Sequence, residues 1–232
     1  MSVAALFDEP ESDFSAAVWR VREVTPETTR RWVTQWHYSR CYPGTGTVGY
    51  GVFAPDLVCL ITISGGTNAF GVARKFGLLG FPGNWEISRV VAHPSAPKNT
   101  ASRAIASCYP MWHARGWDWL FSYADTGQGH HGGIYQALNA VYVGKSAAKV
   151  GFLAEGKPVH PRTLVTRYKT QAWPAVRDLA AADGVILERV EGLNSAKHAY
   201  ILPIGPPSSR RAIRAALGPH IKTYPKREIT TT

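Results

Sequence analysis

The sequence lacks any long hydrophobic run, although 45% of its residues are apolar. A helix that crosses a bilayer needs roughly 20 consecutive apolar residues, and no uncharged stretch of the chain approaches that length. Acidic residues gather between positions 8 and 13, which is unlike the basic start of a secretory signal peptide. We therefore expect a cytoplasmic protein with no membrane partner.

Cysteine is scarce as well. The three cysteines, Cys41, Cys59 and Cys108, are widely spaced and form no C-x-x-C pair. This pattern supports neither a disulfide framework nor a structural zinc site, and it suits a reducing compartment. The chain also has no G-x-S-x-G and no H-E-x-x-H, so the serine hydrolase and zinc protease classes lack their signatures.

Acidic residues are few relative to basic ones, 16 against 26, and the net charge is +10. A positive surface attracts polyanions, of which nucleic acid is the commonest. Two segments, 157–177 and 210–227, contain Lys and Arg but no acid, and the first interleaves them with Tyr168 and Trp173. We expect double-stranded DNA as partner; a solvated basic face is the alternative. The basic residues of the first segment are Lys157, Arg162, Arg167, Lys169 and Arg177.

The first part of the chain predicts a strand, a helix and a hairpin. Residues 18–24 alternate as in a strand, and Thr25-Pro26 starts a helix, because Thr caps backbone N–H groups and Pro favours the first helical position. Residues 47–53 and 57–65, joined by a turn at 54–56, predict a β-hairpin.

The glycines at 44, 46 and 49 match the spacing G-x-G-x-x-G. A dinucleotide fingerprint follows a strand and opens a helix, whereas these glycines precede the first strand of the expected hairpin. We interpret them as the flexible entry to that hairpin.

The middle of the chain predicts strand, helix, strand and helix, at 84–93, 100–115, 117–124 and 134–142. Pro110 is expected to kink or shorten the first of these helices. Short connections between such elements indicate an α/β protein whose central sheet is mixed and partly parallel, flanked by helices. Ligands of such sheets bind at the carboxyl ends of strands.

We expect three segments in the chain: an acidic disordered arm over 1–17, one compact catalytic domain over 18–205, and a basic tail over 206–232. A last strand is expected at 197–205, and the proline-rich stretch after it marks the end of the compact domain.

Asp125 is the best-placed carboxylate, because it follows a strand and precedes a glycine-rich loop. A carboxylate there suits a base or a metal ligand, and His37 and Tyr38 would complete an oxygen and nitrogen ligand set if the fold brings them near. The alternative is that Asp125 caps the next turn while His37 and Tyr38 pack.

Three further residues have open roles. Arg89 lies in an apolar strand and must find a partner, either Glu86 or a substrate. Ser102, in the first turn of a helix, either caps backbone N–H groups or contacts a substrate or phosphate. Tyr135 is expected in the core.

Three blocks resemble the Mom family of phage DNA-modification proteins: WHYSR at 36–40, NWEISRVV with NTASRAI within 84–105, and FSYADTGQGHHGGIYQALNAVYVG at 121–144. The resemblance covers about residues 30–145. It implies a divergent GNAT acetyltransferase fold, in agreement with the element order. It also implies conversion of adenine in phage DNA to N6-carbamoylmethyladenine, which protects the DNA from host restriction enzymes, in the host cytoplasm.

The resemblance also implies site residues. The family's proposed iron ligands fall on His37, Tyr38 and Asp125, and its activity-linked positions on Arg89, Ser102 and Tyr135, with Asp125 also catalytic. Ordinary GNAT enzymes hold the pyrophosphate of an acyl-CoA on a glycine-rich loop, and SAPKNTAS stands there instead. Lys98, Asn99 and Ser102 would then hold the phosphates of acetyl-CoA or another two-carbon donor.

The leading hypothesis is therefore a DNA adenine N6-carbamoylmethyltransferase that flips its target base out of the duplex. Two alternatives stay open. One is a GNAT acyltransferase that uses acetyl-CoA on a protein or small molecule, and the other is a DNA-binding protein without catalysis. The sequence leaves the oligomeric state open, a homodimer included.

Overall fold

The computed structural model describes residues 19–44, 46–66, 69–159 and 161–226, and its contacts divide the chain into two compact units. Unit 1 comprises residues 1–123, 132–144 and 200–224, and unit 2 comprises residues 124–131, 145–199 and 225–232. The acidic arm expected over 1–17 lies outside the described residues. The domain limits 18–205 and 206–232 stay a prediction.

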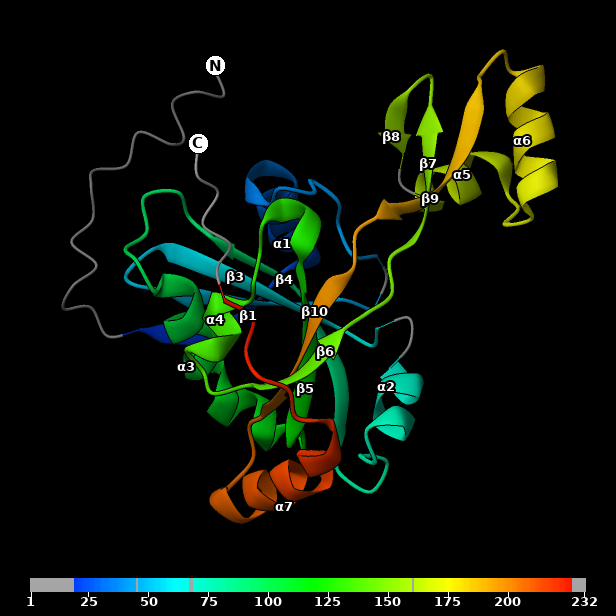
Figure 1. Cartoon of the computed structure of the whole chain (residues 1–232). Coiled ribbons are helices and arrows are strands. Elements are labelled where there is room, and N and C mark those ends of the chain that lie inside the picture. The colour runs from blue at the N-terminus through cyan, green and yellow to red at the C-terminus, as the bar shows by residue number, and fades with distance from the viewer. Residues whose placement is uncertain (1–18, 45, 67–68, 160, 227–232) are drawn as a thin grey trace, which may run out of the picture. The chain divides into compact units, whose positions relative to one another are not determined.

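A seven-stranded sheet with strand order β1-β2-β3-β4-β5-β10-β6 forms the centre of unit 1 (Figure 1). The β1–β2, β2–β3 and β3–β4 pairs are antiparallel, and the β4–β5 pair is parallel. The mixed, partly parallel α/β sheet flanked by helices is thus confirmed. Its strands are β1 (Arg20–Val24), β2 (Val48–Phe53), β3 (Leu57–Ser64), β4 (Gly83–Ala92), β5 (Trp119–Asp125), β6 (Val141–Lys145) and β10 (Lys197–Pro203).

The helices of unit 1 bury apolar stripes against this sheet. One core cluster joins α2 and α7 to Trp119, Phe121 and Ile201 of the sheet, through Val72, Phe76, Ile213 and Leu217 among others. The helices are α1 (Pro26–Trp36), α2 (Ala69–Lys75), α3 (Thr100–Ala114), α4 (Gly133–Gln136) and α7 (Pro207–Leu217), with a short 3-10 turn η3 (Gly218–His220).

Unit 2 has a three-stranded sheet of its own, in the order β8-β7-β9. A small apolar core of Leu164, Val176, Ala180 and Leu187 lies beneath it. The sequence pattern after Gly144 was too weak to predict this module. Its elements are η2 (Thr126–Gln128), β7 (Lys149–Ala154), β8 (Lys157–Val159), α5 (Pro161–Tyr168), α6 (Trp173–Ala182) and β9 (Leu187–Asn194).

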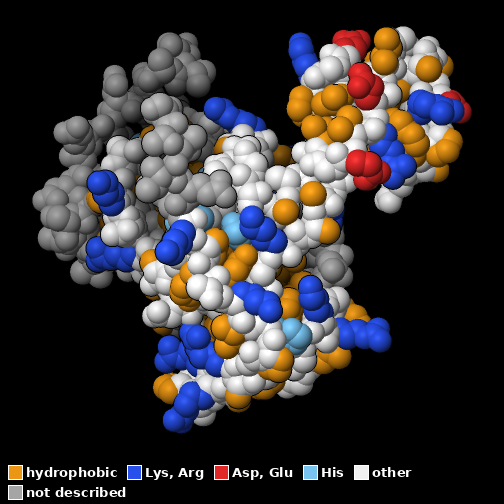
Figure 2. Space-filling view, viewed as in Figure 1, with side chains coloured by type: hydrophobic (Ala, Val, Ile, Leu, Met, Phe, Trp, Pro, Cys, Tyr) orange, Lys and Arg blue, Asp and Glu red, His pale blue; other side chains and the backbone are white. Residues whose placement is uncertain are grey.

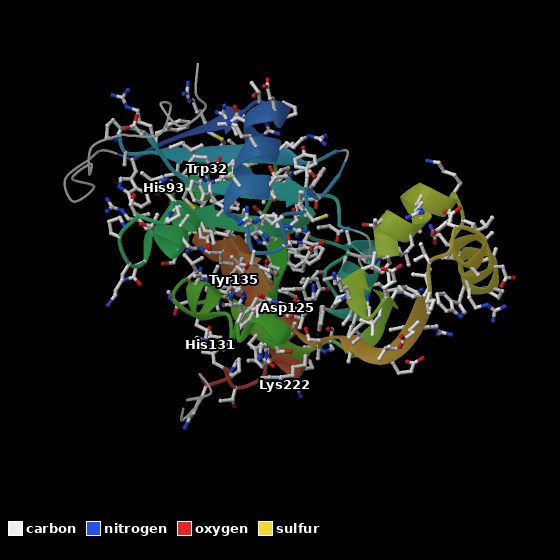
Figure 3. All side chains as sticks on the ribbon, turned by 90° about the horizontal axis from the view of Figure 1, so that it is seen from above. Trp32, His93, Asp125, His131, Tyr135 and Lys222 are labelled. Atoms are coloured by element: carbon white, nitrogen blue, oxygen red, sulfur yellow. The ribbon has the colours of Figure 1, made fainter. Side chains whose placement is uncertain are left out.

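Local signals place α1 and the hairpin as expected. Thr25 Oγ1 accepts the N–H of Thr28 at 3.2 Å, so Thr25 is the predicted cap of α1. Trp32 and Trp36 lie on one face of this helix, with ring centroids 5.8 and 5.3 Å from that of His93; Figure 3 labels Trp32 and His93. The hairpin of β2 and β3 is also confirmed.

The helix expected over 100–115 is confirmed as α3, which continues through Pro110 to Ala114 and is therefore not shortened there. One expectation about a helix was wrong. The helix expected over 134–142 ends at Gln136, because Asn139 takes a left-handed conformation with φ 53° and the chain then enters strand β6, beside β10. The apolar residues from Val141 onward therefore form an edge strand of the sheet and not the apolar face of a helix.

None of the helices in the described part of the chain combines the length and hydropathy that a bilayer crossing requires.

Buried tyrosines make stability sensitive to alkali. Burial raises the pKa of Tyr50, Tyr135 and Tyr200 from 10 to about 12. Between these values the unfolded chain releases protons that the folded chain retains, so we expect the free energy of unfolding to fall from pH 10 to pH 12. Urea titrations across this range measure it. The Tyr50→Phe variant should show a shallower decline, and an equal slope in both proteins would contradict the prediction.

Candidate active site in unit 1

Strands β4 and β5 part in the middle of the sheet. Their parallel pairing runs from Gly83↔Trp119 to Ile87↔Ser122 and continues no further within the described residues. At the same level the register of β4 against β3 shifts, because Ile87 pairs with Ile63 while Arg89 pairs with Thr62. Ser88 is therefore an extra residue in β4, as in a β-bulge, which bends a strand away from its neighbour. This parting opens the sheet at the carboxyl ends of both strands.

A pocket of about 400 Å³ lies in unit 1 at the carboxyl end of β4. Its lining comes from Ala92 and Pro97, from residues 99–102 at the start of α3, and from Gly133, Ile134 and Ala137 in and after α4. The size is within the usual range of small-molecule sites. Two predicted donor-binding residues, Asn99 and Ser102, line the pocket, whereas Lys98 is exposed and is not in its lining.

The start of α3 offers this pocket unused polar groups. Asn99 precedes the helix in a left-handed conformation (φ 67°) and its side chain makes no capping bond. Within the described residues, the N–H groups of Ala101 and Ser102 meet no acceptor. The Thr100 hydroxyl is buried and has no hydrogen-bond partner among the residues that the structure describes. Uncapped amides and a spare hydroxyl at a helix N-terminus suit a phosphate group.

Ser102 itself does not cap the helix. Its hydroxyl donates to the carbonyl of Asn99 at 3.0 Å. The alternative that Ser102 caps backbone N–H groups is therefore wrong. Thr100, which the sequence did not single out, is the more informative residue, because a hydroxyl without a partner is visible only after folding.

Replacing Thr100 by valine should have different effects on the stability of the protein and on its affinity for coenzyme A. The change removes a buried hydroxyl that has no partner, so we expect the free energy of unfolding without ligand to stay level or rise by up to about 1 kcal/mol. Binding of coenzyme A should weaken by roughly 5- to 10-fold. Calorimetry with coenzyme A and thermal unfolding measure the two effects.

Thr34→Val is the matched control, because the Thr34 hydroxyl is exposed and already donates to Arg30. Unchanged coenzyme A affinity in Thr100→Val would show that the start of α3 holds no phosphate.

Tyr135 is buried on α4, one residue after Ile134, and is not itself among the residues that line the pocket; Figure 3 labels it within unit 1. Its hydroxyl lies 2.6 Å from Ser122 Oγ on β5. The pKa of Tyr135 is raised to about 12: burial raises it most, the bond with Ser122 lowers it, and Tyr38 and Glu86 raise it. The phenol is therefore protonated at neutral pH, and two segments far apart in sequence act on it.

Glu86 is a site residue that the sequence suggested only as a partner for Arg89. Its charge raises the pKa of Tyr135, and after burial it is the second cause that raises the pKa of Tyr123. A Cβ atom on Gly66 would lie 2.9 Å from Glu86 Oε2, so this chain segment passes close over the carboxylate. Glu86 thus lies near both tyrosines where β4 and β5 part.

Arg89 makes no ion pair with Glu86 within the described residues. Its Nε donates to the carbonyl of Cys41 at 3.3 Å and its Nη1 to that of Ser88 at 2.5 Å. The guanidinium is partly buried and its acceptors are neutral carbonyls, so its charge has no anionic partner among the described residues. Arg89 also ties the loop after His37 and Tyr38 to β4. The structure thereby brings Arg89, Tyr38 and Tyr135 into one region of unit 1.

His37 is buried at the end of α1. Its Nδ1 lies 2.8 Å from Ser39 Oγ and 3.1 Å from the backbone nitrogen of Ser39. In one neutral tautomer Nδ1 donates to the Ser39 hydroxyl, which leaves Nε2 unprotonated for a metal; in the other Nδ1 accepts the Ser39 N–H and Nε2 carries the proton. The ring packs against Tyr38 with centroids 4.2 Å apart. We assign no step to iron.

Asp125 belongs to unit 2, and nearby groups already contact both oxygens of its carboxylate. Oδ1 accepts the N–H of Gly127 and the hydroxyl of Ser195, and Oδ2 lies 3.6 Å from Lys197 Nζ. Asp125 caps η2, as the alternative reading of the sequence had it. The described residues contain no group of three His, Cys, Asp or Glu side chains arranged for a metal. The set of His37, Tyr38 and Asp125 stays a prediction.

The sequence matches the model of the Mom protein family over residues 18–226. The chain belongs to the Mom family. This membership covers both units of the structure, including the module of β7 to β9. No curated protein sequence matches this Mom protein.

Solved structures similar to this Mom protein are acetyltransferases and a related synthase. A Bacillus subtilis acetyltransferase in complex with CoA has 10% identity, covers 80% of this chain and 99% of its own, and has a TM-score of 0.44. The Enterococcus faecium aminoglycoside 6'-N-acetyltransferase has 11% identity, coverage of 81% and 98%, and a TM-score of 0.44. The CoA-dependent acyl-homoserine lactone synthase MesI has 11% identity, coverage of 86% and 95%, and a TM-score of 0.40.

Proposed function

We propose that this Mom protein modifies adenine in phage DNA to N6-carbamoylmethyladenine and so protects the DNA from host restriction enzymes. Membership of the Mom family over residues 18–226 supports the reaction. The observation that carries the proposal is the pocket of about 400 Å³ in unit 1, lined in part by Ile134, the residue before the buried Tyr135; the two-carbon donor and the adenine would meet there.

The pocket is the proposed site of the two-carbon donor. Asn99, Thr100 and Ser102 would hold a phosphate-bearing carrier such as acetyl-CoA by the open N–H groups at the start of α3. Such a carrier would present the two-carbon unit in the pocket; because an acyl-CoA activates only the carbonyl carbon of that unit, no bond-forming step to the CH2 carbon is assigned to it. The apolar lining from Ala92, Ile134 and Ala137 would exclude water from it.

The adenine is proposed to enter where β4 and β5 part. The charge of Glu86 raises the pKa of both Tyr123 and Tyr135, so the carboxylate lies near both side chains. We assign Glu86 as the general base that accepts a proton from the N6 amino group of adenine. Arg89 would hold an anionic group of the DNA or of the donor, because its own charge has no carboxylate partner in the described structure.

DNA is the proposed partner because unit 1 is strongly basic. On the face shown in Figure 2, acidic side chains appear only on unit 2, while Lys and Arg side chains spread over unit 1. Among the described Lys and Arg residues of unit 1, Arg115 alone forms an ion pair, with Glu23. The unpaired remainder would contact phosphates.

The basic segment 157–177 of unit 2 is a weaker candidate for DNA contact. Arg167 and Arg177 pair with Asp183 and Asp178. Tyr168 and Trp173 pack in the core of unit 2 instead of forming an open stacking surface.

Expression beside a plasmid tests the function. Mass spectrometry of the digested nucleosides should detect N6-carbamoylmethyladenine, and Tyr135→Phe should lower its yield strongly. Tyr50→Phe is the matched control, because it also removes one buried tyrosine hydroxyl, one that has no partner. Unmodified adenine in the presence of folded protein would contradict the proposal.

The mass of the product separates the alternatives. Carbamoylmethylation joins N6 to a CH2 carbon, whereas acetyl transfer forms an amide of different mass. An acetylated base would identify an acyltransferase, and tight DNA binding without any modified base would identify a binding protein.

A further inference from the structure

Ser122 occupies the last position at which β5 still pairs with β4. Its side chain is 1% exposed, and its hydroxyl donates to the carbonyl of Ile87 at 2.7 Å. Ile87 is the β4 residue that pairs with Ser122. The Ser122 side chain thus fastens β5 to β4 at the point beyond which the two strands diverge.

The same hydroxyl determines the direction of the Tyr135 proton. A serine hydroxyl carries one proton, and a carbonyl oxygen can only accept. Because the Ser122 proton goes to Ile87, the contact of 2.6 Å between Ser122 Oγ and Tyr135 must use the tyrosine proton. Tyr135 is therefore the donor in this pair, and its phenol oxygen keeps its lone pairs for another group.

We propose that Ser122 is a positioning residue that holds the Tyr135 proton inward, so that the phenol oxygen accepts a hydrogen bond from a substrate N–H. The inference rests on the proposed function and adds to it, since it names the N6 amino group of adenine as that donor. The chain of hydrogen bonds ends at the Ile87 carbonyl, which has no proton to pass on. In this arrangement the phenol oxygen of Tyr135 can only accept a further hydrogen bond.

The surroundings hold this arrangement in place. The Tyr135 ring packs on Tyr200 with centroids 5.2 Å apart. Burial disfavours the phenolate most, and the charge of Glu86 disfavours it as well, so Tyr135 keeps its proton across the neutral range. A protonated phenol with a fixed hydrogen is an acceptor of defined direction.

NMR of the protein without substrate tests the direction of the bond. We expect the Tyr135 hydroxyl proton to exchange slowly and to show a contact with the β-protons of Ser122. Ser122→Ala should abolish the slow exchange, and Ser122→Thr, which keeps the hydroxyl, should preserve it. Ser107→Ala is the control, because that serine is exposed and bonds to Arg103 on α3.

A fast-exchanging Tyr135 hydroxyl in the wild-type protein would overturn the inference, and so would slow exchange that survives in Ser122→Ala. This outcome does not depend on any catalytic activity. It therefore separates failure of the inference from failure of the proposed function, which shows as unmodified adenine.

A double-mutant cycle tests the positioning role in the reaction. Ser122→Ala should lower kcat for adenine modification by about 10- to 100-fold, the usual effect of losing one buried hydrogen bond in a site. In the Tyr135→Phe background the same change should cost less than about twofold, because Ser122 acts through the tyrosine hydroxyl. Ser122→Thr should restore most of the rate.

Independent, multiplying losses in the two variants would instead mean that Ser122 only fastens β4 to β5, and would overturn the positioning role. Thermal unfolding of each variant reports that purely structural contribution separately.

Discussion

Replacing Arg89 by alanine is expected to lower the rate of the proposed adenine modification by roughly 100-fold or more, with the fold intact. The guanidinium is partly buried, and it donates hydrogen bonds to the carbonyls of Cys41 and Ser88. Its other N–H groups and its positive charge remain to bind an anionic group of the DNA or of the donor. Alanine removes that charge where solvent cannot replace it. Nucleoside mass spectrometry over time measures the rate, and thermal unfolding checks the fold.

Arg89→Lys should fail to restore the rate. A lysine keeps the charge but has a single nitrogen, which cannot reach both carbonyls and an anion together. Arg115→Ala is the control, because Arg115 is an exposed arginine already paired with Glu23, and such surface pairs contribute little. A rate within twofold of wild type in Arg89→Ala would remove Arg89 from the site.

Gly132→Ala is expected to destabilise the protein by roughly 3 to 5 kcal/mol. Gly132 has φ +81°, and an added Cβ atom would lie 2.3 to 2.6 Å from the ring and hydroxyl of Tyr200. The ring cannot move freely, because it also packs on Tyr135 and Tyr142. Urea denaturation measures the loss, and the displaced ring should disturb Tyr135 and lower activity as well.

Gly116→Ala isolates the contact from the backbone strain. Gly116 has nearly the same φ, +80°, but no atom lies within 4 Å of its added Cβ. The backbone strain alone should cost about 1 to 2 kcal/mol. An equal loss of unfolding free energy in Gly132→Ala and Gly116→Ala would contradict this prediction. It would mean that the Tyr200 ring moves aside without an energetic cost and that the start of α4 is not tightly packed.

Much of the fold was predictable from local patterns. Thr25-Pro26, the turn at 54–56 and the alternation in β1 each specify their own element, because a cap, a turn and a periodicity act within a few residues. The expected helix over 134–142 failed for the opposite reason. Its second half forms β6, whose partner β10 comes more than 50 residues later in the chain.

The site residues divide in the same way. Arg89, Ser102 and Tyr135 were expected from their blocks, and the structure places Arg89 against Cys41, Ser102 in the pocket lining and Tyr135 in a buried hydrogen bond. Thr100 and Ser122 carry no sequence signal. A hydroxyl stands out only when its burial and its partners are known.

The sequence by itself determined the α/β class, the order of most elements and the positive charge, because these depend on composition and short-range periodicity. The tertiary structure alone decided where β4 and β5 part and which charges act on Tyr135. It also decided that His37 Nδ1 is occupied by Ser39. Each of these depends on which groups fold within a few ångströms of one another, and spacing along the chain does not specify such distances.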